Sequence, residues 1–310
     1  MATQTLAEAK KLINNQIVVG VAEDIISINP MFDILPFTGY EGQGLVVNRE
    51  NALGDAGVYS VGDTITHKGA ATFVGVTFTA TKLIGDAELD GLVVAQSASA
   101  GVDQTAIEIS SKAKTIGRLF QTGMATGGGT SPAMNSLHSL CDSGQYTGAS
   151  AGQAVSFALL DELFDLVKSK DGQVDWCQMP ARTIRSYKVL LRALGGATIS
   201  EVVTLPGGRK VIGYEGTPIF KNEFLSVVET ANGAALAGGA LTSVWAGCFD
   251  DGTNKVGVAG IHPINVPAGI QVEPIGAQEA VDGKIWRVKQ YANFASFNRK
   301  GIARLPSINN

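Results

Sequence analysis

The stretch from residue 42 to residue 84 limits the possible folds most, because it predicts a long pair of strands with little chain of its own to pack on. Leu45 to Val47 predicts a short strand, and the second strand follows after turn sequences at 54–57, 61–63 and 67–70. In the second strand apolar and polar side chains alternate with the two-residue strand period: Val74, Val76, Phe78 and Ala80 against Thr77, Thr79 and Thr81. An isolated hairpin is at best marginally stable in water, so this one needs something to lie on.

One long amphipathic helix is predicted after the hairpin, over residues 103–125. Asp103 is a good N-cap, and the apolar stripe that follows ends at the glycines 127–129, which we interpret as a helix stop or hinge. The stripe has spacings of three and four residues: Ala106, Ile109, Ala113, Ile116, Phe120 and Met124. At about 1.5 Å per residue, such a helix spans about 33 Å and can brace one side of a domain.

The remaining elements predict an α+β protein with mixed sheets. Helices are predicted over 153–170 and 181–194, with a strand at 174–179 between them, and the chain beyond Gly195 is mostly β. Residues 1–37 predict an arm of short helices, interrupted by Pro30 and Pro36, which does not form a domain by itself. Several apolar side chains of the arm and hairpin therefore need partners elsewhere: Ile25, Ile26, Phe32, Leu35, Val74 and Phe78.

Composition excludes several classes of protein. With 310 residues, 45% hydrophobic and 17% charged, the chain is globular and long enough for two domains or for one with long excursions. A net charge of −4 gives no basic footprint for a sequence-reading DNA binder. Three scattered cysteines (141, 177 and 248) favour buried free thiols over a disulfide framework. The start has no secretory signal pattern, and the uncharged stretch 231–248 is too rich in Ala and Gly for a membrane span.

The sharpest enzymatic motif is G-x-S-x-G at residues 148–152. Ser150 would be the nucleophile, with Asp250 and His262 downstream in the order found in α/β-hydrolases. A nucleophile elbow follows directly after an apolar strand, and residues 141–147 are polar turn sequence instead. We therefore interpret the motif as a loop before a helix and keep a Ser hydrolase as an alternative. Neither common glycine-rich phosphate loop occurs.

Metal and carboxylate sites are not indicated either. Of the three histidines, only His138 lies near a cysteine, Cys141, and two ligands do not make a zinc site. The acidic groups are interpreted as solvated surface: Asp161 and Glu162 on a helix, and Asp250, Asp251, Asp86, Glu88 and Asp90 in turn sequence. We predict no catalytic, cofactor-binding or metal-binding residues and no cofactor.

A basic stripe marks the helix predicted at 181–194. Arg182, Arg185, Lys188 and Arg192 follow at spacings of three and four, which places them on one face. They face solvent or an acidic neighbour, for which the preceding helix offers Asp161, Glu162 and Asp165, also on an adjacent copy.

The order of these elements resembles the major capsid protein of tailed bacteriophages with the Hong Kong 97-like fold. Three segments carry the resemblance: VVGVAEDIISINPMFDILPF followed by VVNRE, DQTAIEISSKAKTIGRLFQTGM, and GYEGTPIF with KIWRVKQYANFASFNRKGIARL. The resemblance implies an N-terminal arm (1–40), an E-loop hairpin (41–85) and a peripheral domain (86–150) with the spine helix (103–125). An axial domain (151–265) and closing strands of the peripheral domain (266–310) follow.

The family implies a structural role without enzymatic activity. Copies assemble as pentamers and hexamers into an icosahedral head around double-stranded DNA, without sequence-specific or membrane contacts. The implied partners are a portal protein, a separate scaffolding protein, since the arm begins near Met1, and a decoration protein. The implied location is the virion, after synthesis in the bacterial cytoplasm. A phage tail or decoration protein is a further alternative.

One family property is not expected here. The founding member cross-links an E-loop Lys to a neighbour's Asn with the help of a Glu. In this sequence the excursion from Gly42 to Thr81 offers only Lys68 as the amine, and no Glu follows Glu279 beside the late Asn293 and Asn298. We therefore predict a shell without cross-links.

Overall fold

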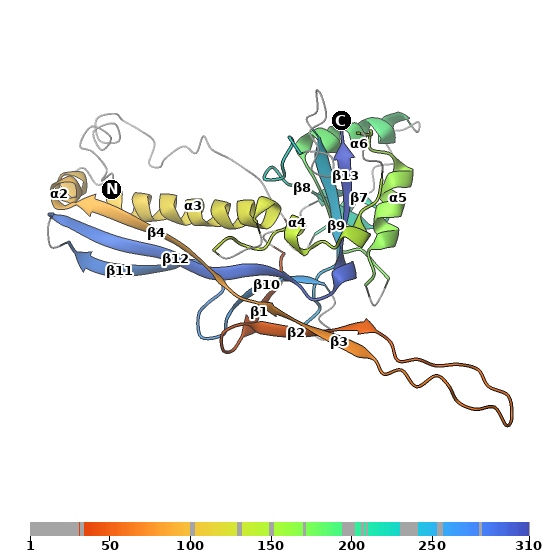
Figure 1. Ribbon diagram of the computed structural model, residues 1–310. Coiled ribbons are helices and arrows are strands. Elements are labelled where there is room, and N and C mark those ends of the chain that lie inside the picture. Colours follow the sequence, from red (N-terminus) through yellow and green to blue (C-terminus); the bar gives the residue numbers. More distant parts are fainter. Residues whose placement is uncertain are drawn as a thin grey trace.

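The computed structural model describes most of the chain (Figure 1). The described residues are 31, 34–99, 103–128, 132–148, 152–169, 172–193, 202–205, 208, 210–229, 241–252, 257–278 and 281–309. Most of the predicted arm therefore lies outside the described residues. At its end, Met31 is fully buried in the main core and Leu35 is buried beside it.

A five-stranded sheet forms one part of the molecule. Its strands are β1 (Phe37–Tyr40), β10 (Val258–Pro263), β12 (Gly283–Ser296), β11 (Gln271–Ala277) and β4 (Thr81–Asp90). The 14-residue β12 is its centre, since it pairs with β10 near its end, with β11 near its start and with β4 along the other edge. Only β1 and β10 pair in parallel in this sheet.

The long helix α3 (Gln104–Thr126) lies along this sheet, as predicted (Figure 1). The carboxylate of Asp103 accepts a hydrogen bond from the backbone N–H of Ala106 at 3.1 Å and so caps its start. Ile116, Phe120 and Met124 of the predicted stripe are buried. The short helix α2 (Gly91–Ser99) joins β4 to α3.

The second part is a six-stranded sheet. Its order is β13 (Ile302–Ile308), β9 (Thr242–Gly247), β5 (Trp176–Met179), β8 (Thr217–Lys221), β7 (Lys210–Tyr214) and β6 (Val202–Thr204). Helices α5 (Phe157–Leu166) and α6 (Ala181–Ala193) pack on one face through Leu160, Leu163, Tyr187 and Leu191. The other face joins the main core, in which Trp176 and Trp245 lie with Phe120 of α3.

Short elements link these parts. They are α4 (Leu137–Leu140), η2 (Ser143–Gln145) and η3 (Arg299–Gly301). Two mixed sheets with helices on their faces confirm the predicted α+β class.

The predicted hairpin is also confirmed, and it projects away from both sheets (Figure 1). Strands β2 (Leu45–Ala52) and β3 (Thr72–Phe78) form a two-stranded antiparallel sheet, and the connection 53–71 contains no strand. Only its base packs on the body, where Phe78 is buried with Tyr40 and Ile261. Leu35 and Phe78, two of the side chains expected to need partners elsewhere, are covered by the chain's own core.

Three sequence interpretations are corrected. The helix predicted over 153–170 is shorter, because Gln153 forms a β-bridge with Ile308 and the helix begins only after Ser156. Asp86, Glu88 and Asp90 lie on strand β4 instead of in a turn. That strand runs through residue 85, the predicted limit of the hairpin, and belongs to the five-stranded sheet.

No helix among the described residues is long and apolar enough to span a membrane.

Candidate assembly surfaces

The hairpin tip exposes large apolar side chains to an unusual degree. Val58 and Val61 are fully exposed, and Leu53 and Ile65 are each more than half exposed. Soluble monomers rarely present contiguous apolar surface of this kind unless it binds something. The hairpin tip, defined here as residues 53–71, is therefore the first candidate for a contact with another protein.

A cluster of hydrogen-bonded polar groups around Tyr59 links the two sides of the hairpin tip. The hydroxyl of Tyr59 accepts hydrogen bonds from the backbone N–H groups of Thr66 and His67 at 2.9 and 2.8 Å, and it lies 2.6 Å from His67 Nδ1. The hydrogen bond with the Thr66 side chain and those with the two backbone N–H groups lower the pKa of Tyr59. The apolar side chains are thus displayed on a defined loop.

Arg49 fastens the hairpin base to the body. Its guanidinium donates hydrogen bonds to the carbonyl oxygens of Phe297 and Ser296 at 3.1 and 2.6 Å, just beyond and at the end of β12. It also lies 5.8 Å from the ring centroid of Phe78. Burial lowers the pKa of Arg49, because a charged group is less stable away from water. The two carbonyl oxygens partly compensate this cost by accepting its hydrogen bonds.

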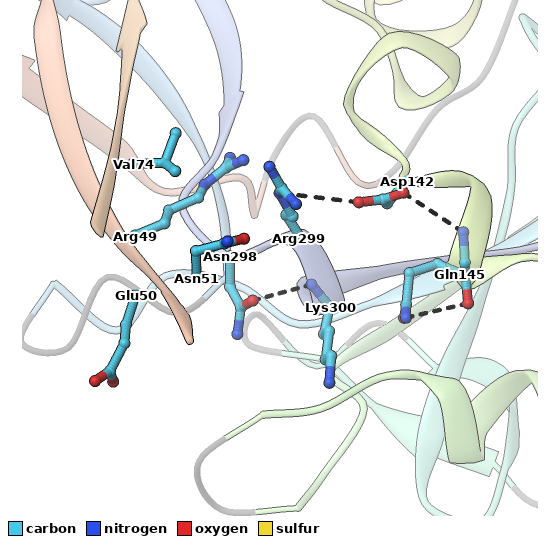
Figure 2. Close-up of a pocket in the computed structure, with 10 residues that line it drawn as sticks. Arg49, Glu50, Asn51, Val74, Asp142, Gln145, Asn298, Arg299 and Lys300 are labelled. Atoms are coloured by element: carbon cyan, nitrogen blue, oxygen red, sulfur yellow. Dashed lines mark hydrogen bonds and ion pairs between the residues drawn. The ribbon is translucent and has the colours of Figure 1, made fainter. Parts of the chain in front are cut away.

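A cavity of about 500 Å³ lies beside this fastening. Figure 2 shows hairpin residues, including Glu50 and Asn51, along one side and residues of η2 and η3 along the other. On this second side Arg299 and Asp142 form an ion pair with 3.8 Å between the charged atoms. Asn298 lines the same cavity as Glu50, so the sequence argument that no Glu accompanies the late asparagines does not hold in space.

One acidic residue of β4, Asp86, belongs to a row of charged side chains across the five-stranded sheet. Arg287 of β12 makes a bidentate pair with Asp86 at 2.9 Å and lies opposite Glu273 of β11, which in turn pairs with Lys289 at 2.5 Å. These groups are partly exposed, which supports their interpretation as solvated surface. The hydrogen bond from Arg287 lowers the pKa of Asp86.

The predicted basic stripe lies on α6, and three of its four side chains are exposed. Arg185, Lys188 and Arg192 are exposed, whereas Arg182 at the helix start is half-buried. On α5, Asp161, Glu162 and Asp165 are exposed. The Tyr214 hydroxyl donates to Asp161, and the Thr147 hydroxyl donates to Glu162 at 2.7 Å.

The structure brings together a buried polar cluster that sequence reasoning missed. Arg304 of β13 donates hydrogen bonds to Glu229 at 3.1 Å and to Ser243 at 2.9 Å. His138 of α4 is 3.3 Å from the other oxygen of Glu229. These four residues are far apart in sequence, so no local motif reveals them. The one available signal was Arg304 itself, a charge within the apolar strand IARLPSI.

The hydrolase residues do not form a triad in the described part of the chain. Ser150 lies outside the described residues, and the described segment before it, 132–148, contains α4, η2 and a single β-bridge instead of a strand. His262 lies in the five-stranded sheet, where its Nδ1 is 2.8 Å from the carbonyl oxygen of Val266. Asp250 is buried after β9 of the other sheet, so its interpretation as solvated surface was wrong.

Metal ligands are not gathered among the described residues. They contain no group of three or more Asp, Glu, His and Cys side chains arranged to hold an ion. Cys141, the neighbour of His138 in sequence, is 3.7 Å from the carbonyl oxygen of Ile302. All three cysteines are free and buried, as predicted. Burial raises the pKa of Cys141 to about 12.

Comparison with known proteins places this architecture. No family model and no curated protein matches the chain. Among solved structures, the SrpI encapsulin of Synechococcus elongatus PCC 7942 matches with a TM-score of 0.72 at 16% identity, over 100% of this chain and 97% of that chain. The capsid protein of cyanophage A-1(L) matches with a TM-score of 0.70 at 9% identity, over 99% and 100%. The capsid protein of a native GTA particle matches with a TM-score of 0.67 at 13% identity, over 97% of each chain. The chain therefore has the Hong Kong 97-like fold, over its full length.

Proposed function

We propose that the chain is a structural shell protein, the major capsid protein of a tailed phage. It would assemble as pentamers and hexamers into an icosahedral head around double-stranded DNA. The observation that carries the proposal is the hairpin tip, whose Val58 and Val61 are fully exposed in the isolated chain. In a shell, a neighbouring copy covers them.

Assembly of identical copies fits the shape of the molecule. The hairpin leaves the body in one direction, so its contact with another copy joins two different surfaces. Such heterologous contacts build closed rings when the rotation between copies closes. In this proposal the five-stranded sheet with α3 is the peripheral domain, and the six-stranded sheet with α5 and α6 is the axial domain. Strand β10 then belongs to the peripheral domain and β13 to the axial domain, in contrast to the predicted bounds 151–265 and 266–310.

The charge of the chain supports a container that does not grip its genome. Non-specific DNA binding depends on many Lys and Arg contacts to phosphate, and this chain has a net charge of −4. A portal protein, a separate scaffolding protein and a decoration protein are the further partners that a phage head implies. The location would be the virion, after synthesis in the bacterial cytoplasm.

A second candidate is the shell of an encapsulin-type compartment. The likeness to the SrpI encapsulin, which extends over the whole chain, favours it. Both candidates predict closed particles, and the contents distinguish them. Particles from infected or induced cells that retain nuclease-protected double-stranded DNA indicate a phage head, and particles without nucleic acid indicate a compartment.

Assembly is tested with the hairpin tip. The double variant Val58→Asp, Val61→Asp places charges on the two fully exposed valines, so it should leave a folded chain that forms no closed particles in negative-stain micrographs. The control Thr64→Asp adds charge to the same exposed loop without removing apolar surface, and it should assemble. Normal particles from the double variant, or none from the wild-type chain, would contradict the proposal.

A further inference from the structure

The exposed face of α6 carries three basic side chains and, at one edge, an apolar one. Successive helix residues are about 100° apart, so Arg185, Lys188, Val189 and Arg192 fall within an arc of about 100° on the side opposite the buried Tyr187. Val189 is 59% exposed and lies at one edge of this arc, beside Arg185. We call these four residues the basic face.

The exposed side of α5 carries the opposite charge. Ala158, Asp161, Glu162 and Asp165 fall within an arc of similar width, opposite the buried Leu163. Here three carboxylates follow a small side chain, Ala158, along the same side of the helix. We call these four residues the acidic face.

The two faces do not neutralise each other within one chain. Both helices cover the same face of the six-stranded sheet, and aromatic contacts join them, such as that of Phe157 with Tyr187 at 6.1 Å between ring centroids. Among the described residues, no ion pair involves Arg185, Lys188 or Arg192, and none involves an acidic residue of α5. Each face is therefore open to a partner of opposite charge.

We propose that the basic face of α6 docks on the acidic face of α5 in a second copy of this chain. In this contact the Lys and Arg side chains of one copy pair with the three carboxylates of the other. The inference rests on the proposed assembly of identical copies and names the surfaces that meet between their six-stranded sheets. Complementary charge of this kind fixes the register between subunits and penalises wrong pairings.

DNA phosphate is the less favoured partner for the basic face. A phosphate backbone would also approach the acidic face on the same layer of helices, where three carboxylates repel it. The overall charge of −4 adds to this repulsion. A second copy satisfies both faces at once.

The test is a charge swap in the full-length chain. One variant carries Arg185→Glu and Arg192→Glu, and a second carries Glu162→Lys and Asp165→Lys. Asp161 is left intact because it accepts the Tyr214 hydroxyl. The third variant carries all four changes. A matched control, Lys82→Glu with Lys284→Glu, makes the same charge change as the first variant at exposed residues of the five-stranded sheet.

Circular dichroism and thermal unfolding establish that each variant folds, and gradient sedimentation with negative-stain microscopy measures closed particles. We expect each double variant to lose particles roughly tenfold or more, because exposed pairs are individually weak but are repeated around each ring. We expect the four-change variant to recover them and the control to assemble normally.

The inference is overturned if the double variants assemble like the wild-type chain, if the four-change variant does not recover, or if the control is impaired equally. Assembly with reduced DNA content in the α6 variant would assign the basic face to the genome and overturn it as well. All these outcomes presuppose wild-type particles, so they leave the proposed function standing; absence of wild-type particles contradicts that function instead.

Discussion

The guanidinium of Arg49 donates a 2.6 Å hydrogen bond to the carbonyl oxygen of Ser296, a residue 247 positions further along the chain. A second bond, to Phe297, completes the fastening of β2 to the end of β12. Because the hairpin tip has no contact with the body in Figure 1, the direction in which the hairpin projects depends on contacts at its base. Arg49 supplies charge-assisted hydrogen bonds to this base.

Replacing Arg49 with Ala should loosen the hairpin base. The variant loses two charge-assisted hydrogen bonds, which corresponds to about 1–3 kcal/mol in the free energy of unfolding. Hydrogen exchange of the amides in β2 and β3 should accelerate, while exchange in α3 stays unchanged. Arg49→Lys retains the charge but not the forked geometry of the guanidinium, so its exchange rates should lie between those of the wild-type chain and the Ala variant. Unchanged exchange in the Ala variant would show that apolar packing alone holds the base.

A second prediction concerns the glycine at the end of α3. Gly127 has a φ of −58°, which any residue can adopt, but a Cβ there would lie 2.4 Å from the carbonyl oxygen of Gly123 and 2.5 Å from that of Met134. Gly127→Ala should therefore destabilise the chain by about 1–3 kcal/mol through overpacking. Gly117→Ala is the matched control, since open space surrounds Gly117 in the same helix. It should stabilise the chain by about 0.5–1 kcal/mol. Equal denaturation midpoints for the two variants would refute the steric argument.

The buried cluster around Glu229 predicts a dependence of stability on pH. Burial opposes ionisation of Glu229, but the hydrogen bonds from His138 and Ser243 and the charge of Arg304 outweigh it and hold its pKa below the usual value of 4.5. A group with a lowered folded-state pKa stabilises the fold above its unfolded-state pKa and loses this contribution as the pH falls through the folded value. The free energy of unfolding should therefore decrease below about pH 4.5.

Glu229→Gln tests this contribution. The variant should be less stable at pH 7, because the buried Arg304 loses its counter-charge, and its stability should fall less steeply in acid. Asp86→Asn is the comparison, since its partly exposed pair with Arg287 contributes only about 0–1 kcal/mol. Denaturation midpoints from pH 3 to pH 7 measure both. Parallel pH profiles for Glu229→Gln and the wild-type chain would contradict the assignment.

The elements that the sequence predicted are those whose cause is local. The α3 helix has its cap and its whole apolar stripe within one segment, and the alternation of β3 lies within seven residues. In β4 the signal was also present, because Ala87 and Leu89 are buried and alternate with Asp86, Glu88 and Asp90. The turn interpretation gave the charges too much weight.

The remaining features depend on partners that are distant in sequence. The local sequence pattern predicts that a helix begins at Gln153, but this residue pairs with Ile308 in a β-bridge and is therefore extended. The buried cluster joins His138, Glu229, Ser243 and Arg304 only through the folding of two sheets around α4. Exposure of the valines at the hairpin tip likewise follows from where the hairpin projects, which no sequence period encodes.

The last prediction is that the shell is held by non-covalent contacts. The hairpin's amine, Lys68, lies in the exposed tip. Asn293 is unsuited as its acceptor, because it is buried, its amide group donates to Thr79 at 2.7 Å and its oxygen accepts from Asn135 at 2.9 Å. Asn298 is the better candidate, since it shares the cavity of Figure 2 with Glu50.

Even there, the chemistry is unfavourable. Glu50 and Lys68 are exposed to solvent, and water stabilises both the carboxylate and the ammonium group, which opposes proton transfer between them. The oxygen of Asn298 already accepts from the backbone N–H of Lys300 at 3.0 Å. Particles boiled in detergent should therefore run as a single band near 32.2 kDa. A ladder of oligomers that Lys68→Arg, Asn298→Ala or Glu50→Gln abolishes would show that the cavity is a cross-linking site, because only a covalent bond survives these conditions and only its own participants remove it.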